Sequence, residues 1–262
     1  MYDELTKEEG DHLKKYKIPA LERAIDILNL IAESKEVVTL MVVCEKLSIA
    51  KSTAYTTLNV LEYYDFIKKN EDGGFEIGFK LYELGLNYLS KVNITEVAKP
   101  YLKELVNHTG LTVHLAMLHK GEMLYLDKVE SNSFIKFSTY PGMKEAIHNS
   151  SLGKAVSAFL DEDKLDEIIN EKGLERYTSN TITDYEEFKE QLIVIRENGY
   201  ALEDEEGEIG VRCVGAPIFG GDSTYPTYAV SVVAHKSELT YEKVPKIGAK
   251  VKEIAERISK KI

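Results

Sequence analysis

Apolar residues recur with a helical period in the first third of the chain. A helix is predicted from Pro19 onward, because apolar positions then repeat every three or four residues at Leu21, Ala24, Ile25, Leu28 and Ile31. Thr39 is typical of a helix N-cap, and a turn at 48–50 separates this second helix from a third that opens at Lys51. The buried sides of the second and third helices are predicted to hold Leu40, Val43, Leu47, Ala54, Leu58 and Leu61.

A β-hairpin is predicted next. The apolar pairs at 66–67 and 75–77 flank Asn-Glu-Asp-Gly-Gly at 70–74, a strong turn signal. Helix, turn, helix and hairpin in this order are typical of a winged helix-turn-helix, which places its second helix in a DNA groove. The pattern therefore favours a DNA-binding domain at 18–78, after a charged tail at 1–17 and before a linker helix at 79–92.

The remaining residues, 93–262, alternate between two periods. A helix is predicted from an Asn93 cap to Gly110, with a kink or a break at Pro100. Period-two patterns predict strands at 112–118, 123–129, 134–139, 200–202, 211–219 and 228–234. Helices are predicted at 152–160, 165–169, 184–199 and 241–262. Strands mixed with helices, without regular βαβ alternation, favour an α+β domain with an antiparallel sheet.

Composition restricts the possible functions. The chain has 262 residues and a formal net charge of −11, which argues against broad non-specific DNA affinity. The first 90 residues carry 11 basic and 16 acidic side chains, but 46–70 carries four lysines against two acids. No apolar run is long enough for a bilayer and the N-terminus is too polar for a signal peptide, so a cytoplasmic protein without membrane contact is expected. Cys44 and Cys213 are expected to stay reduced there.

The exposed side of the third helix offers candidate DNA contacts. Hydroxyl groups and lysines commonly bind phosphate, and Tyr or Thr can also reach base edges. The candidates are Lys51, Ser52, Thr53, Tyr55 and Thr56 on the helix and Lys68 and Lys69 on the hairpin. The alternative is that the Ser and Thr residues cap the helix and that the two hairpin lysines are solvated charge.

Three separated motifs resemble the IclR family of transcriptional regulators. They are KSTAYTTLNVLEYYDFI in the third helix, HNSSLGKAVSAFL at 148–160, and GYALEDEEGEIGVRCVGAPIF at 199–219. The resemblance covers Pro19 to the C-terminus. It implies a GAF-like effector domain after the winged helix, and a homodimer or tetramer whose affinity for an operator is changed by a small metabolite, a short carboxylate. Repression is the expected mode.

The resemblance also implies an effector pocket. Its residues carry over by motif to Ser151, Leu152, Glu203, Val211, Cys213 and Ser231. Leu152 could instead be ordinary packing and Cys213 a small buried hydrophobe. The acidic run at 203–206 is predicted to be a solvated surface turn.

Neither metal nor cofactor is predicted. The histidines lack the spacing of a zinc site, and the strand pattern places His114 and His119 on opposite faces. Nucleotide-binding and nucleophile-elbow motifs are absent from the sequence, so an enzyme is not expected. Two alternatives stay open: an enzyme that acts on a small organic acid, and a winged helix that binds proteins in place of DNA.

Overall fold

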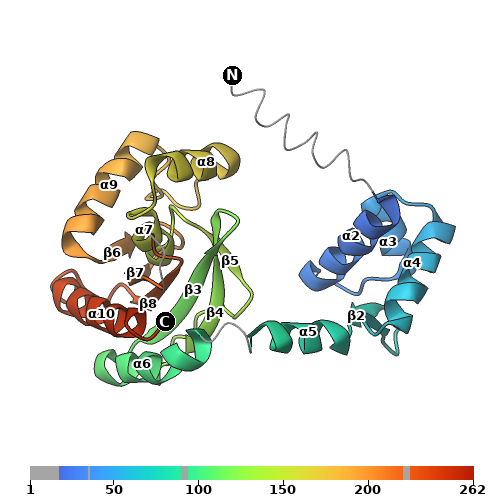
Figure 1. The fold of residues 1–262 in the computed structure, drawn as a ribbon, viewed down its shortest axis with the longest axis horizontal. Coiled ribbons are helices and arrows are strands. Elements are labelled where there is room, and N and C mark those ends of the chain that lie inside the picture. Colours follow the sequence, from blue (N-terminus) through green and yellow to red (C-terminus); the bar gives the residue numbers. More distant parts are fainter. Residues whose placement is uncertain (1–17, 35, 90–93, 221–224) are drawn as a thin grey trace. The chain divides into compact units, whose positions relative to one another are not determined.

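The computed structural model describes residues 18–34, 36–89, 94–220 and 225–262 (Figure 1). The chain divides between residues 91 and 92 into two compact units. The predicted tail at 1–17, the Asn93 cap and the end of the predicted linker lie outside the described residues.

The first unit is a winged helix-turn-helix. Its elements are α2 (Pro19–Glu33), α3 (Leu40–Leu47), α4 (Lys51–Tyr63), β1 (Ile67–Lys69), β2 (Phe75–Ile77) and α5 (Phe79–Leu89). Thr39 caps α3 by accepting the Val42 amide, and Asn70 closes the hairpin turn by accepting the Gly74 amide at 2.7 Å. The core of this unit contains Ile27, Val43, Ala54, Leu58, Leu61 and Ile67.

The second unit is built on one antiparallel sheet of six strands. The strands are β3 (Thr112–His119), β4 (Glu122–Val129), β5 (Lys144–Ala146), β6 (Ala201–Asp204), β7 (Val211–Ile218) and β8 (Tyr228–His235). Their spatial order is β5-β4-β3-β8-β7-β6. Because β3 and β8 pair at the centre, residues that are far apart in the sequence become neighbours there, and His114 lies opposite Ser231.

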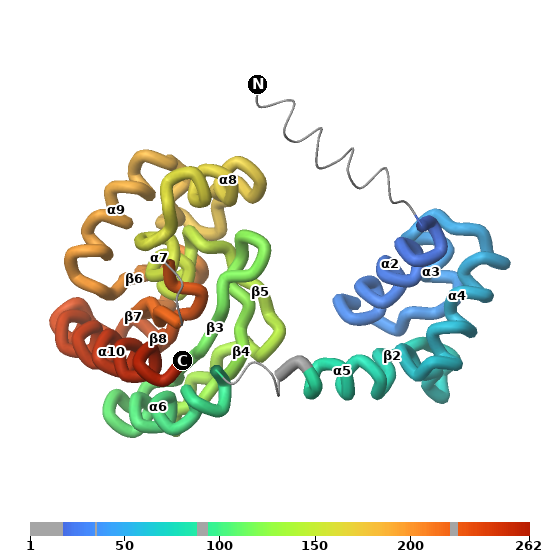
Figure 2. Tube along the Cα trace, viewed as in Figure 1, coloured from blue at the N-terminus to red at the C-terminus, as the bar shows by residue number. Residues whose placement is uncertain are grey.

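Helices cover both faces of this sheet. On one face α6 (Ile94–Thr109) and α10 (Val244–Ser259) pack through Leu102, Leu105 and Ile254, among other residues. On the other face lie α7 (Ser151–Ser157), α8 (Glu162–Lys172) and α9 (Tyr185–Asn198), which bury Leu152, Ile168 and Phe188. Figure 2 shows α6 and α10 along one side of the strands and α8 and α9 along the other. The domain is a three-layer α+β structure.

Of the kink or break expected at Pro100, the break does not occur, because α6 is one helix from Ile94 to Thr109. Pro100 lies on the exposed side, where water can bond the carbonyl that lacks an amide partner, while Ala98 and Leu102 anchor the opposite side in the core.

The strand predicted at 134–139 is a loop. Phe134 is fully exposed, and the carbonyls of Phe137 and Thr139 accept hydrogen bonds from the Lys128 ammonium in place of a neighbouring strand. The strand that pairs with the far edge of β4 is β5, later in the sequence.

Candidate functional site

The exposed side of α4 carries most of the candidate DNA contacts. Lys51, Ser52, Tyr55 and Thr56 are exposed, and Thr53 is half-buried. Ala54, Leu58 and Leu61 face the opposite way, into the core of the unit. The Thr56 hydroxyl donates to the Ser52 carbonyl at 2.9 Å, so its oxygen can still accept a hydrogen bond. One amphipathic helix therefore presents a polar, hydroxyl-rich surface.

The two hairpin lysines differ in their surroundings. Lys68 pairs with Glu76 on the adjacent strand at 3.1 Å, and both side chains are at least half exposed. Lys69 is exposed, and within the described part of the chain no acidic side chain pairs with it. Since an ion pair must open before Lys68 can meet a phosphate, Lys69 is the more available of the two charges.

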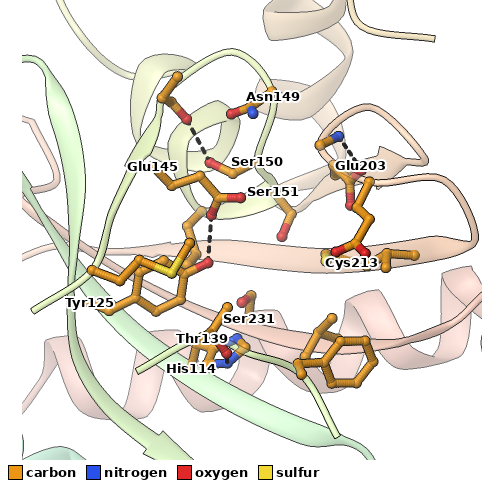
Figure 3. Close-up of a pocket in the computed structure, with 18 of the residues that line it drawn as sticks. His114, Tyr125, Thr139, Glu145, Asn149, Ser150, Ser151, Glu203, Cys213 and Ser231 are labelled. Carbon is orange, nitrogen blue, oxygen red and sulfur yellow. Dashed lines mark hydrogen bonds between the residues drawn. The ribbon is translucent and has the colours of Figure 1, made fainter. Parts of the chain in front are cut away.

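A partly open cavity with both polar and apolar lining residues lies in the second unit, between the sheet and α7. Its volume is about 300 Å³, and its lining includes all six residues carried over by resemblance: Ser151, Leu152, Glu203, Val211, Cys213 and Ser231 (Figure 3). Two cross-strand rows form its floor. Glu203, Cys213 and Val233 make one row, and Gly215, Ser231 and His114 make the other.

Two glycines allow α7 and the residues before it to pack closely against the strands beside the cavity. A Cβ atom at Gly215 would lie 2.7 Å from the Ser151 carbonyl oxygen, and one at Gly153 would lie 2.4 Å from the Ile147 backbone. The first turn of α7 is fixed by Ser150, whose hydroxyl oxygen accepts the Gly153 amide at 3.1 Å. Gly153, in the Gly-Lys-Ala sequence at 153–155, thus allows the close packing of α7 beside the cavity.

Glu203 is a buried acid in the cavity wall. Its side chain accepts the backbone amides of Glu206 and Gly207 at 2.7 and 3.1 Å. Burial nevertheless raises the pKa of Glu203 to about 7, because desolvation of the carboxylate outweighs these hydrogen bonds. Burial also raises the pKa of the neighbouring Cys213 thiol. Both groups are therefore able to carry a proton at neutral pH.

The acidic run at 203–206 is not the solvated turn that the sequence predicted. Glu203 and Glu206 are 2% and 5% exposed. Glu206 forms an ion pair with Lys154, which is fully buried and also donates to Gln191 Oε1 at 2.8 Å. Asp204 and Glu205 pair with Arg212 and Lys236. The acids were predicted to be solvated because their cationic partners are 8 to 52 residues away in the sequence.

Several lining residues were missed by the sequence analysis: His114, Tyr125, Thr139, Glu145, Asn149 and Tyr177. His114 is buried, its Nε2 lies 2.8 Å from the Thr139 hydroxyl, and burial lowers its pKa to about 3, so the ring is neutral. The strand pattern placed His114 on one face of β3, but only the pairing with Ser231 reveals that this face borders a cavity.

The described segments contain neither a metal-binding cluster nor a membrane-spanning helix. Among these residues, no group of three or more His, Cys, Asp or Glu side chains is arranged to hold a metal ion. Within the same ranges, no helix is long and apolar enough to cross a bilayer.

A winged helix-turn-helix and a separate domain with a ligand-sized cavity are typical of ligand-responsive DNA-binding regulators. Comparison with known families agrees. Residues 20–71 match the IclR helix-turn-helix domain, and residues 86–260 match the family described as bacterial transcriptional regulator IclR C-terminal. The chain belongs to the IclR family of transcriptional regulators.

Individual relatives and solved structures match nearly the whole chain. The chain is 35% identical over 230 residues to the uncharacterized HTH-type transcriptional regulator RhmR of Escherichia coli K12, covering 88% of each. It is 30% identical over 246 residues to the transcriptional repressor IclR of the same strain, covering 93% of this chain and 89% of the repressor. The crystal structure of Thermotoga maritima IclR superposes with a TM-score of 0.74 at 36% identity, covering 92% of this chain and 97% of that one.

Proposed function

We propose that this protein is a repressor that binds an operator through α4 and the β1–β2 hairpin. Its affinity for the operator falls or rises when a small effector occupies the cavity. One observation carries the proposal. A chain with a winged helix contains a cavity of about 300 Å³ lined by all six residues that the family motifs assign to effector binding. The relative with the name transcriptional repressor IclR supports the choice of repression.

DNA contact is proposed for the exposed residues of the winged helix. Lys51, Ser52, Thr53, Tyr55 and Thr56 would line the major groove, while Lys68 and Lys69 would meet the flanking phosphates. With so few basic residues, one winged helix binds weakly. A homodimer or tetramer that engages two half-sites on one DNA face would supply the missing affinity. A protein that acts on DNA in this way works in the cytoplasm.

The effector is proposed to be a short carboxylate. An anionic ligand and an anionic Glu203 would repel each other, but burial raises the pKa of Glu203 to about 7. The protonated acid can then donate a hydrogen bond to the ligand carboxylate. The effector shifts the DNA affinity only if it binds the DNA-competent arrangement and the alternative with different affinities.

Catalysis is not proposed for the cavity. Its one thiol, Cys213, has a pKa raised by burial, so it is not poised as a thiolate nucleophile. Its histidine, His114, is neutral and bonded to Thr139. The cavity offers polar groups that recognise a ligand without activating it, as a binding role requires.

A binding assay tests the proposal. Fluorescence anisotropy of full-length protein on DNA from upstream of its own gene should show saturable binding that resists competitor DNA and weakens with salt. Short carboxylates are then added to the complex. A change in anisotropy that follows ligand concentration supports the function. DNA binding that no ligand alters would contradict the effector response and indicate a protein that binds DNA constitutively.

A further inference from the structure

The cavity has a second acidic wall that the family motifs do not assign. Tyr125 on β4 and Glu145 on β5 belong to one edge of the sheet, whereas Glu203 on β6 belongs to the other. All three line the same cavity, and in Figure 3 Glu145 and Glu203 face it from different sides. A ligand that fills the cavity therefore meets a carboxyl group at each end.

This second wall is rich in unused hydrogen-bond acceptors. The Tyr125 hydroxyl donates to Glu145 Oε2 at 2.5 Å, and among the described residues no other donor meets that carboxyl. Asn149, also in the lining and 4% exposed, has a buried side-chain oxygen without a hydrogen-bond partner. Buried acceptors without donors are rare in folded proteins, and at a cavity wall a ligand can supply the donors.

The charges around the cavity limit which donors fit. Burial raises the pKa of Glu145, as it does for Glu203, so both groups resist ionisation. His114 is neutral, and Lys144 is more than half exposed at the rim beside Glu122. Hydroxyl side chains of Ser151, Ser231 and Thr139 fill much of the remaining polar wall.

Ligand hydroxyl groups match this mixture best. A hydroxyl donates one hydrogen bond and accepts others, so it can serve Glu145 and Asn149 while it also accepts from the serines and threonine. An alkyl chain would leave the acceptors unpaired. An ammonium group would satisfy the acceptors but could accept nothing in return.

We propose that Glu145, oriented by Tyr125, forms with Asn149 a hydroxyl-binding subsite that selects a polyhydroxylated short carboxylate as the effector. This inference rests on the proposed function, because it names the part of the effector that lies away from the carboxylate. Glu145 and Asn149 act as specificity-determining residues, and Tyr125 acts as a positioning residue through its bond to Glu145.

Matched probes test the subsite by calorimetric titration of the full-length protein. The probes are pentanoate, 2,3,4,5-tetrahydroxypentanoate as a set of diastereomers, and 5-aminopentanoate. At least one tetrahydroxy diastereomer should bind ten times more tightly than pentanoate or better, because pentanoate leaves the acceptors unpaired. The quantity compared across variants is this ratio of dissociation constants, since general damage to the fold weakens all probes together.

Variants then test whether the preference for the tetrahydroxy probe over pentanoate comes from the subsite. Glu145→Leu and Tyr125→Phe should each reduce it at least threefold, and Glu145→Gln, which keeps an acceptor, should fall between Glu145→Leu and the native chain. Asp166→Leu is the matched control. Asp166 accepts the Tyr185 hydroxyl at the same distance of 2.5 Å, but neither residue lines the cavity. This variant should leave the ratio unchanged.

The outcomes separate the subsite from the proposed function. Pentanoate that binds as tightly as its hydroxylated counterparts, 5-aminopentanoate that binds most tightly, or a ratio that survives Glu145→Leu would each overturn the subsite. If such a ligand still alters DNA affinity, the proposed function stands without it. If none of the three probes binds at tens of millimolar, the short-carboxylate effector and the subsite both fail.

Discussion

The ion pair between Lys154 and Glu206 allows a sharp test of the folded structure. Lys154 is fully buried, and its ammonium meets Glu206, Gln191 Oε1 and, at 3.5 Å, the Leu202 carbonyl. These contacts join α7 to the turn whose amides bind Glu203. Lys154→Met keeps the length of the side chain but removes the charge, so Glu206 is left buried without its cation.

The expected loss follows from that unpaired carboxylate. Removing one member of a buried ion pair costs about 3–5 kcal/mol of stability at pH 7. Burial already raises the pKa of Glu206 in the native chain although Lys154 lowers it, and loss of the ammonium should raise this pKa further above the unfolded value. The stability that the neutral acid contributes is complete below the unfolded pKa and is lost as the pH rises, so the deficit should be smallest near pH 4.5 and largest above pH 7.

Urea unfolding followed by far-UV circular dichroism measures the loss. The chain contains no tryptophan, so the helical signal is the better probe. The double variant Lys154→Met/Glu206→Leu is the control, because replacing the whole pair with apolar groups is often neutral. A single variant that loses less than about 1 kcal/mol, or a double variant no better than the single one, would refute the buried, mutually dependent pair.

Three further predictions concern charge and recognition. Burial raises the pKa of Glu203 from 4.5 to about 7, so the stability that its neutral form contributes is complete below pH 4.5 and is lost as the pH rises through 7. In urea unfolding at pH 8, the free energy of unfolding of Glu203→Gln should therefore exceed that of the native chain by up to about 3 kcal/mol. At pH 4.5 the two free energies should be equal. Lys51→Ala and Lys69→Ala should each flatten the salt dependence of DNA affinity by about one unit, and an unchanged slope would remove that lysine from the interface. Ser231→Val, on the cavity floor, should raise the effector concentration for a half-maximal response by about tenfold, through a lost hydrogen bond; an unaltered response would displace the effector from this floor.

Local patterns predicted the fold well where local chemistry determines it. The Thr39 cap of α3 forms as the sequence indicates, by accepting the Val42 amide, and the helix predicted at 184–199 is capped by Asp184, which accepts the Glu187 amide. The hairpin turn at 70–74 also forms, closed by Asn70 and Gly74. The strand at 134–139 failed for the opposite reason. Its side chains resemble a strand, but Lys128 bonds two of its carbonyls and no neighbouring strand pairs with it.

The cavity depends on contacts that no local pattern reveals. Sequence motifs named six lining residues through family resemblance, while Glu145 and Asn149 were not among the predicted pocket residues. Glu206 likewise resembled surface charge, because its partner Lys154 precedes it by 52 residues. The pairing of β3 with β8 and the close packing of α7 on the sheet determine which charges are buried and which residues line the cavity. Both are tertiary contacts, which local sequence patterns do not predict.

The most direct measurement of the central claim is the DNA affinity of the full-length protein with and without a polyhydroxylated short carboxylate. Genomic fragments selected by the protein would provide the operator, and anisotropy titrations at several salt concentrations would provide the affinity. We predict specific, salt-sensitive DNA binding whose dissociation constant changes at least fivefold when the effector saturates the cavity. A DNA affinity that no cavity ligand changes would contradict the effector response. The absence of specific binding to any genomic fragment would contradict the proposed function as a whole.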